Sequence, residues 1–222
     1  MEKDNTLKVC EIFTSIQGES SYAGWPCTFV RLTGCNLRCG YCDTKYAYYE
    51  GDVLTVSEIA AKVAATGIRL AEITGGEPLL QKETPALAET LCGMGIAVVI
   101  ETNGSIDISC LKSIPLVTVI MDIKTPSSGM SDNNDFTNIA RLTRQDEVKF
   151  VIGSRDDYTW AVRIMRQYEI DKICTVLMSP MTLPPSSIDP KLLSKWILDD
   201  KLSVRLNIQL HRYIFGQDVR GV

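Results

Sequence analysis

The 222-residue chain has the length of one ordinary domain, and its 45% hydrophobic and 23% charged residues are typical of a globular protein with a substantial core. No apolar run approaches the about 20 residues of a membrane-spanning helix. The charged N-terminus lacks the apolar stretch of a signal peptide, so we expect a cytoplasmic protein without a membrane partner. With a net charge of −4, the chain has no large positive field to gather phosphates, and we expect no nucleic-acid partner.

Short apolar, β-branched runs alternate with helical patterns along the whole chain, without internal repeats, low-complexity tracts or linkers. This organisation predicts a single domain over residues 1–222. Most of the runs are nearly continuous in apolar residues, as in parallel strands covered on both faces. The predicted strands are Thr28–Leu32, Leu70–Ile73, Ala97–Ile100, Val117–Met121, Val148–Ile152, Ile173–Leu177 and Val204–Ile208.

The segments between these strands carry helix signals. Thr55-Val-Ser-Glu58 is a capping box, and residues 85–94 have a helical pattern that ends at Gly95. Ser154 and Asp189-Pro190 begin two further helices. Strands that alternate with helices predict an α/β fold, and about six βα units favour a partial (βα)6-type barrel over a full eight-fold one. An open doubly wound sheet is the alternative that periodicity leaves open.

Three of the eight cysteines crowd into one short segment, Cys35, Cys39 and Cys42, with the spacing C-x3-C-x2-C. The other five stand alone, and each is interpreted as a small buried hydrophobe: Cys10, Cys27, Cys92, Cys110 and Cys174. Three thiolates on a four-iron cluster would leave one iron open for an exogenous ligand. A zinc site and three unrelated core cysteines are the alternatives. Structural zinc takes four ligands, and this chain has no second C-x2-C pair.

Polar and glycine-rich segments follow the predicted strands at their carboxyl ends. The cysteine segment follows the first strand, and five other segments follow later strands: Thr74–Pro78, Glu101–Gly104, Asp122–Lys124, Ser179-Pro180 and Gln209–His211. In α/β barrels the chemistry lies at the carboxyl ends of the strands. The sequence therefore predicts an active site at one mouth of the barrel.

The cysteine spacing, with Tyr41 before the third cysteine, and the Thr74-Gly-Gly-Glu77-Pro78 segment together resemble the radical S-adenosylmethionine (SAM) superfamily. The resemblance implies a [4Fe-4S] cluster on the three cysteines and SAM bound at its open iron. An external one-electron donor, such as flavodoxin or ferredoxin, then reduces the cluster, and electron transfer from the reduced cluster cleaves the sulfonium of SAM to yield a 5′-deoxyadenosyl radical. The residues that the resemblance places at SAM are Tyr41, Cys42, Asp43, Gly76, Glu77, Asp122, Ile123, Lys124 and Ser179.

The flanking segments Phe13–Glu19, Gly24–Asn36 and Cys42–Thr44 are similar to those of 7-carboxy-7-deazaguanine synthases. This likeness implies ring contraction of 6-carboxy-5,6,7,8-tetrahydropterin with loss of ammonia, in the synthesis of 7-deazapurines such as queuosine. It also implies a homodimer and Mg²⁺ at Thr44. The residues implied at the substrate are Ile16, Gln17, Gly18, Glu19, Arg31, Thr74 and His211.

Other interpretations of these residues stay open on the sequence alone. Arg31 is as well suited to an ion pair with a nearby acid, Glu19 to a helix cap or a surface position, and Thr44 to a cap or turn. His211, the only histidine, is equally a structural side chain. At the level of function, the rivals are an activase of a glycyl-radical enzyme and a non-catalytic zinc or iron–sulfur module.

Overall fold

The computed structural model describes residues 5–182, 187–216 and 219–222. The charged N-terminal residues 1–4, which entered the interpretation of the N-terminus, lie outside these ranges. None of the described helices is long and apolar enough to cross a membrane.

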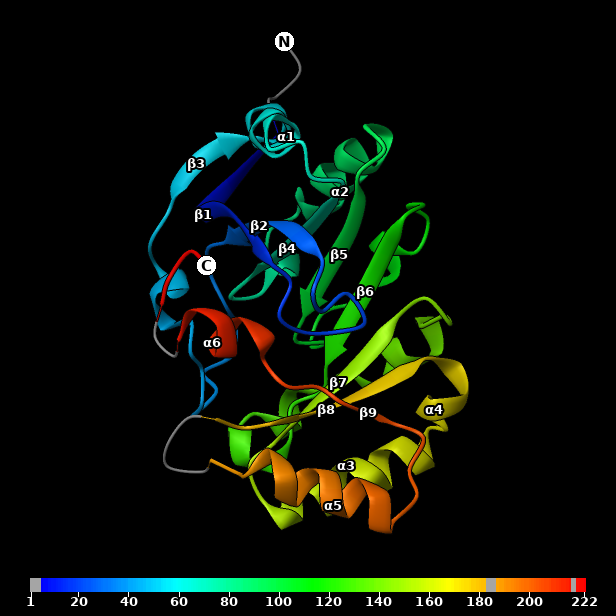
Figure 1. The fold of residues 1–222 in the computed structure, drawn as a ribbon. Coiled ribbons are helices and arrows are strands. Elements are labelled where there is room, and N and C mark those ends of the chain that lie inside the picture. The colour runs from blue at the N-terminus through cyan, green and yellow to red at the C-terminus, as the bar shows by residue number, and fades with distance from the viewer. Residues whose placement is uncertain (1–4, 183–186, 217–218) are drawn as a thin grey trace.

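A single curved sheet forms the centre of the fold (Figure 1). Its strands lie in the order β3-β1-β2-β4-β5-β6-β7-β8-β9, and β1 pairs antiparallel with both β2 and β3, whereas β2 and β4 to β9 are parallel. The two edge strands, β3 and β9, do not pair with each other, so the barrel is partial and open, as predicted. The bounds are β1 Thr6–Ile16, β2 Pro26–Leu32, β3 Asp52–Thr55, β4 Leu70–Gly75, β5 Ala97–Thr102, β6 Val117–Asp122, β7 Glu147–Ile152, β8 Thr175–Pro180 and β9 Arg205–Leu206.

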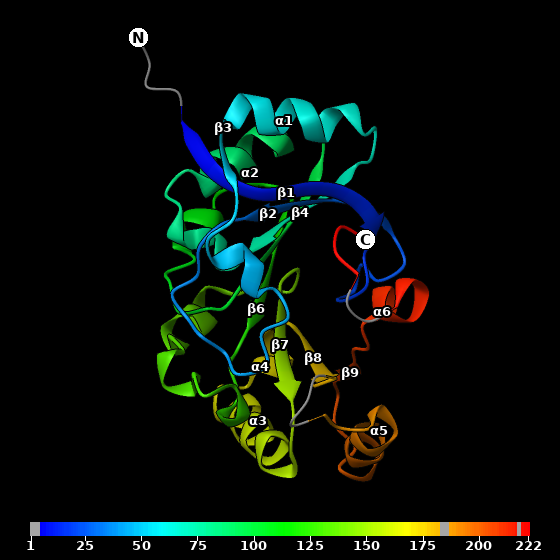
Figure 2. The same ribbon diagram turned by 90° about the vertical axis from the view of Figure 1, so that its left-hand side faces the viewer.

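Four of the described helices, α1, α2, α3 and α5, begin within a residue of where the sequence predicts, whereas α4 and α6 were not predicted. Thr55 caps its helix with the complete capping box, and Ser154 and Asp189 accept hydrogen bonds from backbone N–H groups of the first turns that follow them. In Figures 1 and 2, α1 and α2 lie at one end of the curved sheet, and α3 and α5 lie at the other. The bounds are α1 Val56–Ala65, α2 Thr84–Gly93, α3 Arg155–Gln167, α4 Ile170–Ile173, α5 Pro190–Asp199 and α6 Leu210–Phe215.

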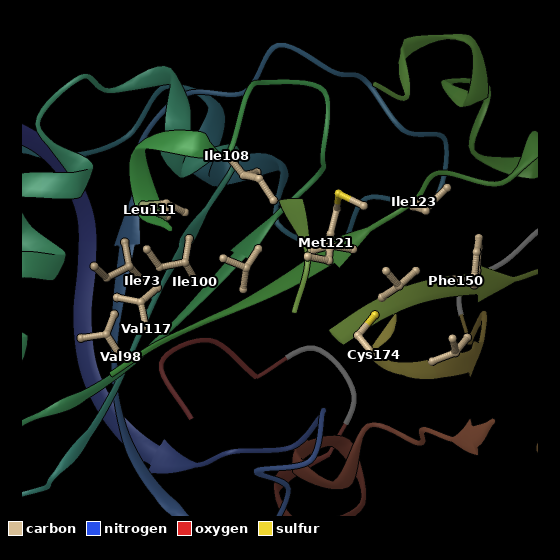
Figure 3. Close-up of a cluster of buried hydrophobic side chains, with 14 of the residues drawn as sticks. Ile73, Val98, Ile100, Ile108, Leu111, Val117, Met121, Ile123, Phe150 and Cys174 are labelled. Carbon is tan, nitrogen blue, oxygen red and sulfur yellow. The ribbon is translucent and has the colours of Figure 1, made fainter. Parts of the chain in front are cut away.

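The main hydrophobic core lies between the sheet and these helices. Alternate residues of the parallel strands, such as Ile73, Ile100 and Met121, point into it and are almost fully buried (Figure 3). Burial of this kind stabilises a fold by about 1.5–3 kcal/mol for each large aliphatic side chain. The core therefore holds the strands in register and fixes where their carboxyl ends lie.

The inner, concave face of the sheet has two layers. A small apolar cluster fills the bottom, made of Cys27, Phe29, Leu70, Val99 and Ile120. On the same face of these strands, the residues nearer the carboxyl ends are polar or charged. Because side chains alternate along a strand, Arg31, Glu72, Glu101 and Asp122 lie two residues beyond members of this cluster and share its face. The apolar layer closes the barrel below, and the charged layer forms the floor of a cavity above it.

The sequence interpretation missed the antiparallel part of the sheet. β1 and β3 were not predicted, because mixed polar and apolar residues in β1 leave no continuous run and β3 has only four residues. The last predicted strand, Val204–Ile208, shortens to two residues in β9. The run Ile173–Leu177 is divided, since Ile173 ends α4 and the strand begins at Thr175. Cys110 is exposed and Cys10 half-buried, whereas Cys27, Cys92 and Cys174 are buried as expected.

Candidate active site

One cavity opens at the carboxyl ends of the parallel strands, where the sequence predicts the active site. It collects side chains from loops that are far apart in sequence. Sixteen of the nineteen predicted site residues line it: Ile16, Gln17, Glu19, Arg31, Cys35, Cys39, Tyr41, Cys42, Asp43, Thr44, Thr74, Gly76, Asp122, Lys124, Ser179 and His211. Gly18, Glu77 and Ile123 are not part of its wall.

The three thiols lie on the loop that leaves β2. Backbone hydrogen bonds fix this loop, from Cys42 N to Cys39 O at 3.2 Å and from Gly40 N to Ser128 O at 3.0 Å. Burial raises the pKa values of Cys35 and Cys39, so these thiols are protonated at neutral pH without a metal and release protons on binding one.

The described side chains do not form a preformed site for a single metal ion. Across residues 5–182, 187–216 and 219–222, no group of three or more His, Cys, Asp or Glu side chains comes together closely enough to hold one ion. A structural zinc ion needs four such ligands, with sulfur atoms about 2.3 Å from the metal. A four-iron cluster instead takes each thiolate on a separate iron, so the three sulfur atoms need not converge on one point.

The Thr74–Pro78 segment packs directly on the cysteine loop. A Cβ at Gly76 would clash with Gly34 O and lie 2.7 Å from Cys35 Cβ, so only glycine allows this approach. Glu77 N donates to Gly34 O at 2.7 Å. The Glu77 side chain is fully buried away from the cavity and accepts from Asn103 N (2.7 Å), Thr102 Oγ1 (2.8 Å) and Leu79 N (2.9 Å). Its carboxylate joins β4 to the end of β5 rather than facing a ligand.

The opposite wall comes from the ends of β6 and β8. Lys124 Nζ donates to Asp122 Oδ2 at 2.8 Å, whereas Asp122 Oδ1 is buried and has no hydrogen-bond partner among the described residues. A buried acceptor without a donor is unfavourable until a ligand supplies one. Ile123 points into the hydrophobic core, because neighbouring residues point in opposite directions. Ser179 accepts from Asn207 Nδ2 at 2.8 Å.

A buried charge network forms the floor of the cavity. Lys149 of β7 contacts Glu101, Glu19 (3.0 Å) and Asp122 (3.8 Å). Burial alone would lower the pKa of Lys149, but the three carboxylates hold it well above its usual value. Burial opposes the charge of Glu19 too, yet Lys149 and a hydrogen bond from Gln209 lower the pKa of Glu19 to about 2. Both groups are therefore charged at neutral pH.

The wall near β1 holds Gln17 and Arg31. The Gln17 amide joins the Glu72 carboxyl to the backbone of Glu19, since its Nε2 donates to Glu72 Oε2 and its Oε1 accepts from Glu19 N at 3.0 Å. Arg31 makes the ion pair that the sequence left open, with its Nε 2.7 Å from Glu11 Oε1. Its terminal nitrogens make no hydrogen bond with the described residues, and the side chain lines the cavity.

Helix α6 brings His211 to the same wall. Leu210 N donates to Gly18 O at 2.9 Å, and a Cβ at Gly18 would clash with the His211 ring. The missing side chain of Gly18 therefore allows α6 to pack closely against it, and Gly18 does not line the cavity. Burial lowers the pKa of His211, which keeps the imidazole neutral at pH 7.

Asp43 links this helix to the cysteine loop. Arg212 Nη2 lies 2.7 Å from Asp43 Oδ2, and Thr44 Oγ1 donates to Asp43 Oδ1 at 2.8 Å.

Sequence reasoning missed several cavity residues, and among them are two ionisable residues of the strands, Glu72 and Lys149. Both stand inside predicted strands, where the apolar runs drew attention to packing. An ionisable residue in an otherwise apolar parallel strand is the signal that could have identified them, because such a side chain needs a polar environment on one face.

Comparisons with known proteins agree with this geometry. Residues 29–185 match the family model of the Radical SAM superfamily. A 7-carboxy-7-deazaguanine synthase from Chlorobaculum tepidum is 42% identical, with all of both chains aligned. Another from Koribacter versatilis is 41% identical over 97% of this chain and all of its own. The crystal structure of QueE from Escherichia coli has the same fold, with a TM-score of 0.77, 21% identity, and coverage of 95% of this chain and 100% of that one.

The family match covers more than half of the chain, and the relatives are aligned over nearly their whole length. The chain belongs to the radical SAM superfamily and, within it, to the 7-carboxy-7-deazaguanine synthases.

Proposed function

We propose that this enzyme converts 6-carboxy-5,6,7,8-tetrahydropterin to 7-carboxy-7-deazaguanine with loss of ammonia, in the synthesis of 7-deazapurines such as queuosine. The observation that carries the proposal is one cavity with two different halves. We call the part lined by the three thiols and the glycine-rich segment the cofactor half, and the part lined by polar side chains from β2, β4, α6 and the β1–β2 connection the substrate half. Such an arrangement holds a cofactor and a polar substrate side by side, which is the positioning that a radical reaction requires.

The cofactor half fits a [4Fe-4S] cluster and SAM. Cys35, Cys39 and Cys42 would hold three irons, because all three thiols line the cavity on one loop. When bound, the reduced cluster and SAM supply the radical that starts the reaction. Backbone groups at Gly76, the unpartnered Asp122 Oδ1, and side chains of Tyr41, Asp43, Lys124 and Ser179 would bind SAM.

The substrate half offers contacts of several kinds. The Arg31 guanidinium would take the substrate carboxylate through its terminal nitrogens, since Glu11 occupies only Nε. Thr74 and neutral His211 offer a hydroxyl and an imidazole. The Gln17 amide is already engaged by Glu72 and Glu19, so the segment Ile16–Gly18 would meet the pterin through backbone groups.

Mg²⁺ would bind at Thr44. The hydroxyl lines the cavity beside Asp43, and oxygen atoms are the ligands that Mg²⁺ prefers. One hydroxyl is too weak alone, so the substrate carboxylate would complete the site. Replacement of Thr44 by Val should weaken the response of turnover to Mg²⁺ and leave the iron content unchanged. An unchanged Mg²⁺ dependence would remove Thr44 from the site.

The enzyme uses a small-molecule substrate and an external electron donor, as radical SAM enzymes do, and we infer that flavodoxin or ferredoxin is the donor. A single domain, a homodimer and a cytoplasmic location complete the proposal, without a nucleic-acid partner. Free cysteines support the reducing compartment, and the exposed Tyr213, Ile214 and Phe215 of α6 support a subunit contact. Light scattering of the purified protein tests the dimer.

Turnover tests the function directly. Anaerobically reconstituted enzyme with reductant, SAM and Mg²⁺ should release 7-carboxy-7-deazaguanine from the pterin. Replacement of any of Cys35, Cys39 and Cys42 by Ala should abolish the iron–sulfur chromophore, whereas the same change at buried Cys27 should leave it. A fully loaded enzyme that ignores the pterin but installs a radical on a glycyl-radical protein would favour the activase alternative.

A further inference from the structure

Glu72 is a cavity residue to which no role has been given so far. It lies in the middle of β4, on the inner face of the sheet, with 4% of its surface exposed. In the register of the sheet, Glu72 lies opposite Phe29 of β2, and Arg31 lies two residues further along the same face, opposite Thr74. The Glu72 carboxyl is therefore below Thr74 and diagonal to Arg31.

The hydrogen bonds of Glu72 occupy only one of its two oxygens. Gln17 Nε2 donates to Oε2, and Gln17 is held in this orientation because its Oε1 accepts from Glu19 N. Oε1 makes no hydrogen bond with any residue that the structure describes, although the side chain lines the cavity. No lysine or arginine within the described ranges lies within ion-pair distance of this carboxyl.

The charged groups around Glu72 favour its neutral form. Glu101 from β5 and Glu19 from the β1–β2 connection face it with negative charge, and the Cys27 thiol from β2 is uncharged. The two cations, Lys149 from β7 and Arg31 from β2, are already paired with other acids. Burial, followed by repulsion from Glu101 and Glu19, raises the pKa of Glu72 to about 8.

A neutral Glu72 carries a hydroxyl that lacks an acceptor. Because Oε2 accepts from Gln17, the proton belongs on Oε1, which faces the cavity. Oε1 is not among the fully buried atoms that lack a partner, so it is reached from the cavity, where a ligand oxygen can accept its hydrogen bond. The pyrimidine ring of a pterin offers neutral acceptors, the C4 carbonyl and N1, whereas the carboxylate is the anionic group that Arg31, diagonal to Glu72, would hold. A carboxylate presents acceptors only, and it would be repelled by an ionised Glu72.

We propose that Glu72 binds the substrate carboxylate, donating a hydrogen bond from its neutral carboxyl to one carboxylate oxygen while the Arg31 guanidinium holds the other. The inference rests on the proposed function, since it assigns the anionic end of that substrate. Gln17 is then a positioning residue, which keeps Oε2 as the acceptor and Oε1 as the donor. The cavity would thus select an anionic ligand by two contacts, the hydroxyl of neutral Glu72 and the Arg31 guanidinium.

Substrate binding provides the test, because it requires no turnover. Binding of 6-carboxy-5,6,7,8-tetrahydropterin to cluster-loaded enzyme, without SAM, is measured anaerobically by calorimetry between pH 6.5 and 9.5. Only the neutral form of Glu72 donates, so the wild-type Kd should be flat below pH 8 and about tenfold higher at pH 9. At pH 8.5, in buffers of different ionisation enthalpy, wild-type binding should take up more than half a proton per site.

Glu72→Gln is the matched variant, since its amide donates a hydrogen bond at every pH. It should bind the pterin at pH 7 within a few-fold of wild type, keep this affinity at pH 9 and take up no proton at pH 8.5. The same pH dependence in both proteins would place the titrating group elsewhere and overturn the inference. A variant that loses the pterin at pH 7, with normal iron content, would make Glu72 an acceptor and overturn it as well.

Failure of the proposed function looks different. Wild-type enzyme that does not bind the pterin at pH 7 refutes the substrate itself. Wild-type enzyme that binds and converts the pterin, but with a flat affinity up to pH 9 and no proton uptake, refutes only the role of Glu72. The proton-uptake measurement on wild type decides this point even if the Glu72→Gln variant fails to fold.

Discussion

Glu77 is the residue for which the structure makes the sharpest distinction between a structural and a cofactor role. The family resemblance places it at SAM, whereas its carboxylate is fully buried and accepts three hydrogen bonds, two from the end of β5 and one from Leu79 in the turn after β4. We predict that Glu77→Gln lowers the stability of the fold and leaves the affinity for SAM nearly unchanged.

The magnitude follows from the contacts. In the variant, the amide oxygen can keep the place of Oε1 and accept from Thr102 Oγ1 and Leu79 N. The amide nitrogen then faces Asn103 N. Both groups are donors, so the 2.7 Å hydrogen bond that Asn103 N makes to Oε2 in the wild type is lost. A hydrogen bond to a charged group contributes about 1.5–3 kcal/mol, and a buried N–H left unpaired costs about 1–3 kcal/mol. The neutral amide is easier to bury than a carboxylate, which offsets part of the loss. We expect a loss of about 2–3 kcal/mol.

Thermal unfolding of cluster-loaded protein under anaerobic conditions measures this loss. For a chain of this size, about 2–3 kcal/mol corresponds to a fall of roughly 4–12 °C in Tm. Glu89→Gln is the control, because Glu89 is an exposed residue of α2. Equilibrium binding of SAM, measured on both variants at equal iron content, gives the second readout. If Glu77→Gln melts like the control but binds SAM at least tenfold more weakly, the structural role is refuted.

Three further predictions concern the wall of the cavity. Gly18→Ala should push His211 and its helix away, which raises KM for the pterin and destabilises the fold by about 1–3 kcal/mol; an unchanged KM would separate this helix from substrate binding. Arg31→Ala should raise KM by roughly 10- to 150-fold through loss of a charge-assisted contact; an unchanged KM would leave Arg31 with only its ion pair. Glu19 has its pKa lowered to about 2 in the folded state from 4.5, so its pairing with Lys149 stabilises the fold above pH 4.5. This contribution should be lost as the pH falls from 4.5 towards 2 in denaturant titrations of cluster-free protein, and Glu19→Gln should reduce the acid sensitivity; equal acid sensitivity in both proteins would contradict the assignment.

Local chemistry made much of the fold predictable. The helix starts at Thr55, Ser154 and Asp189 depend on hydrogen bonds between residues two or three apart, and such contacts are written directly in the sequence. The parallel strands were found for a similar reason, since strands covered on both faces need continuous apolar runs. The long strand β1 escaped because its pairing partners are distant and its faces are only partly buried.

Three features of the candidate site can be read from local sequence: the thiol spacing, the glycine-rich segment after β4 and the polar residues at the carboxyl ends of the strands. What each polar side chain faces depends on the packing of distant strands. Glu77 turns into the β4–β5 contact, Ile123 into the core and Glu72 into the cavity, although all three stand in or beside predicted strands. The physical reason is that the partners of a buried carboxyl come from other strands. Whether Glu72 contacts a cation, an amide or the cavity therefore depends on the register of the strands and the curvature of the sheet, and no local sequence pattern encodes either.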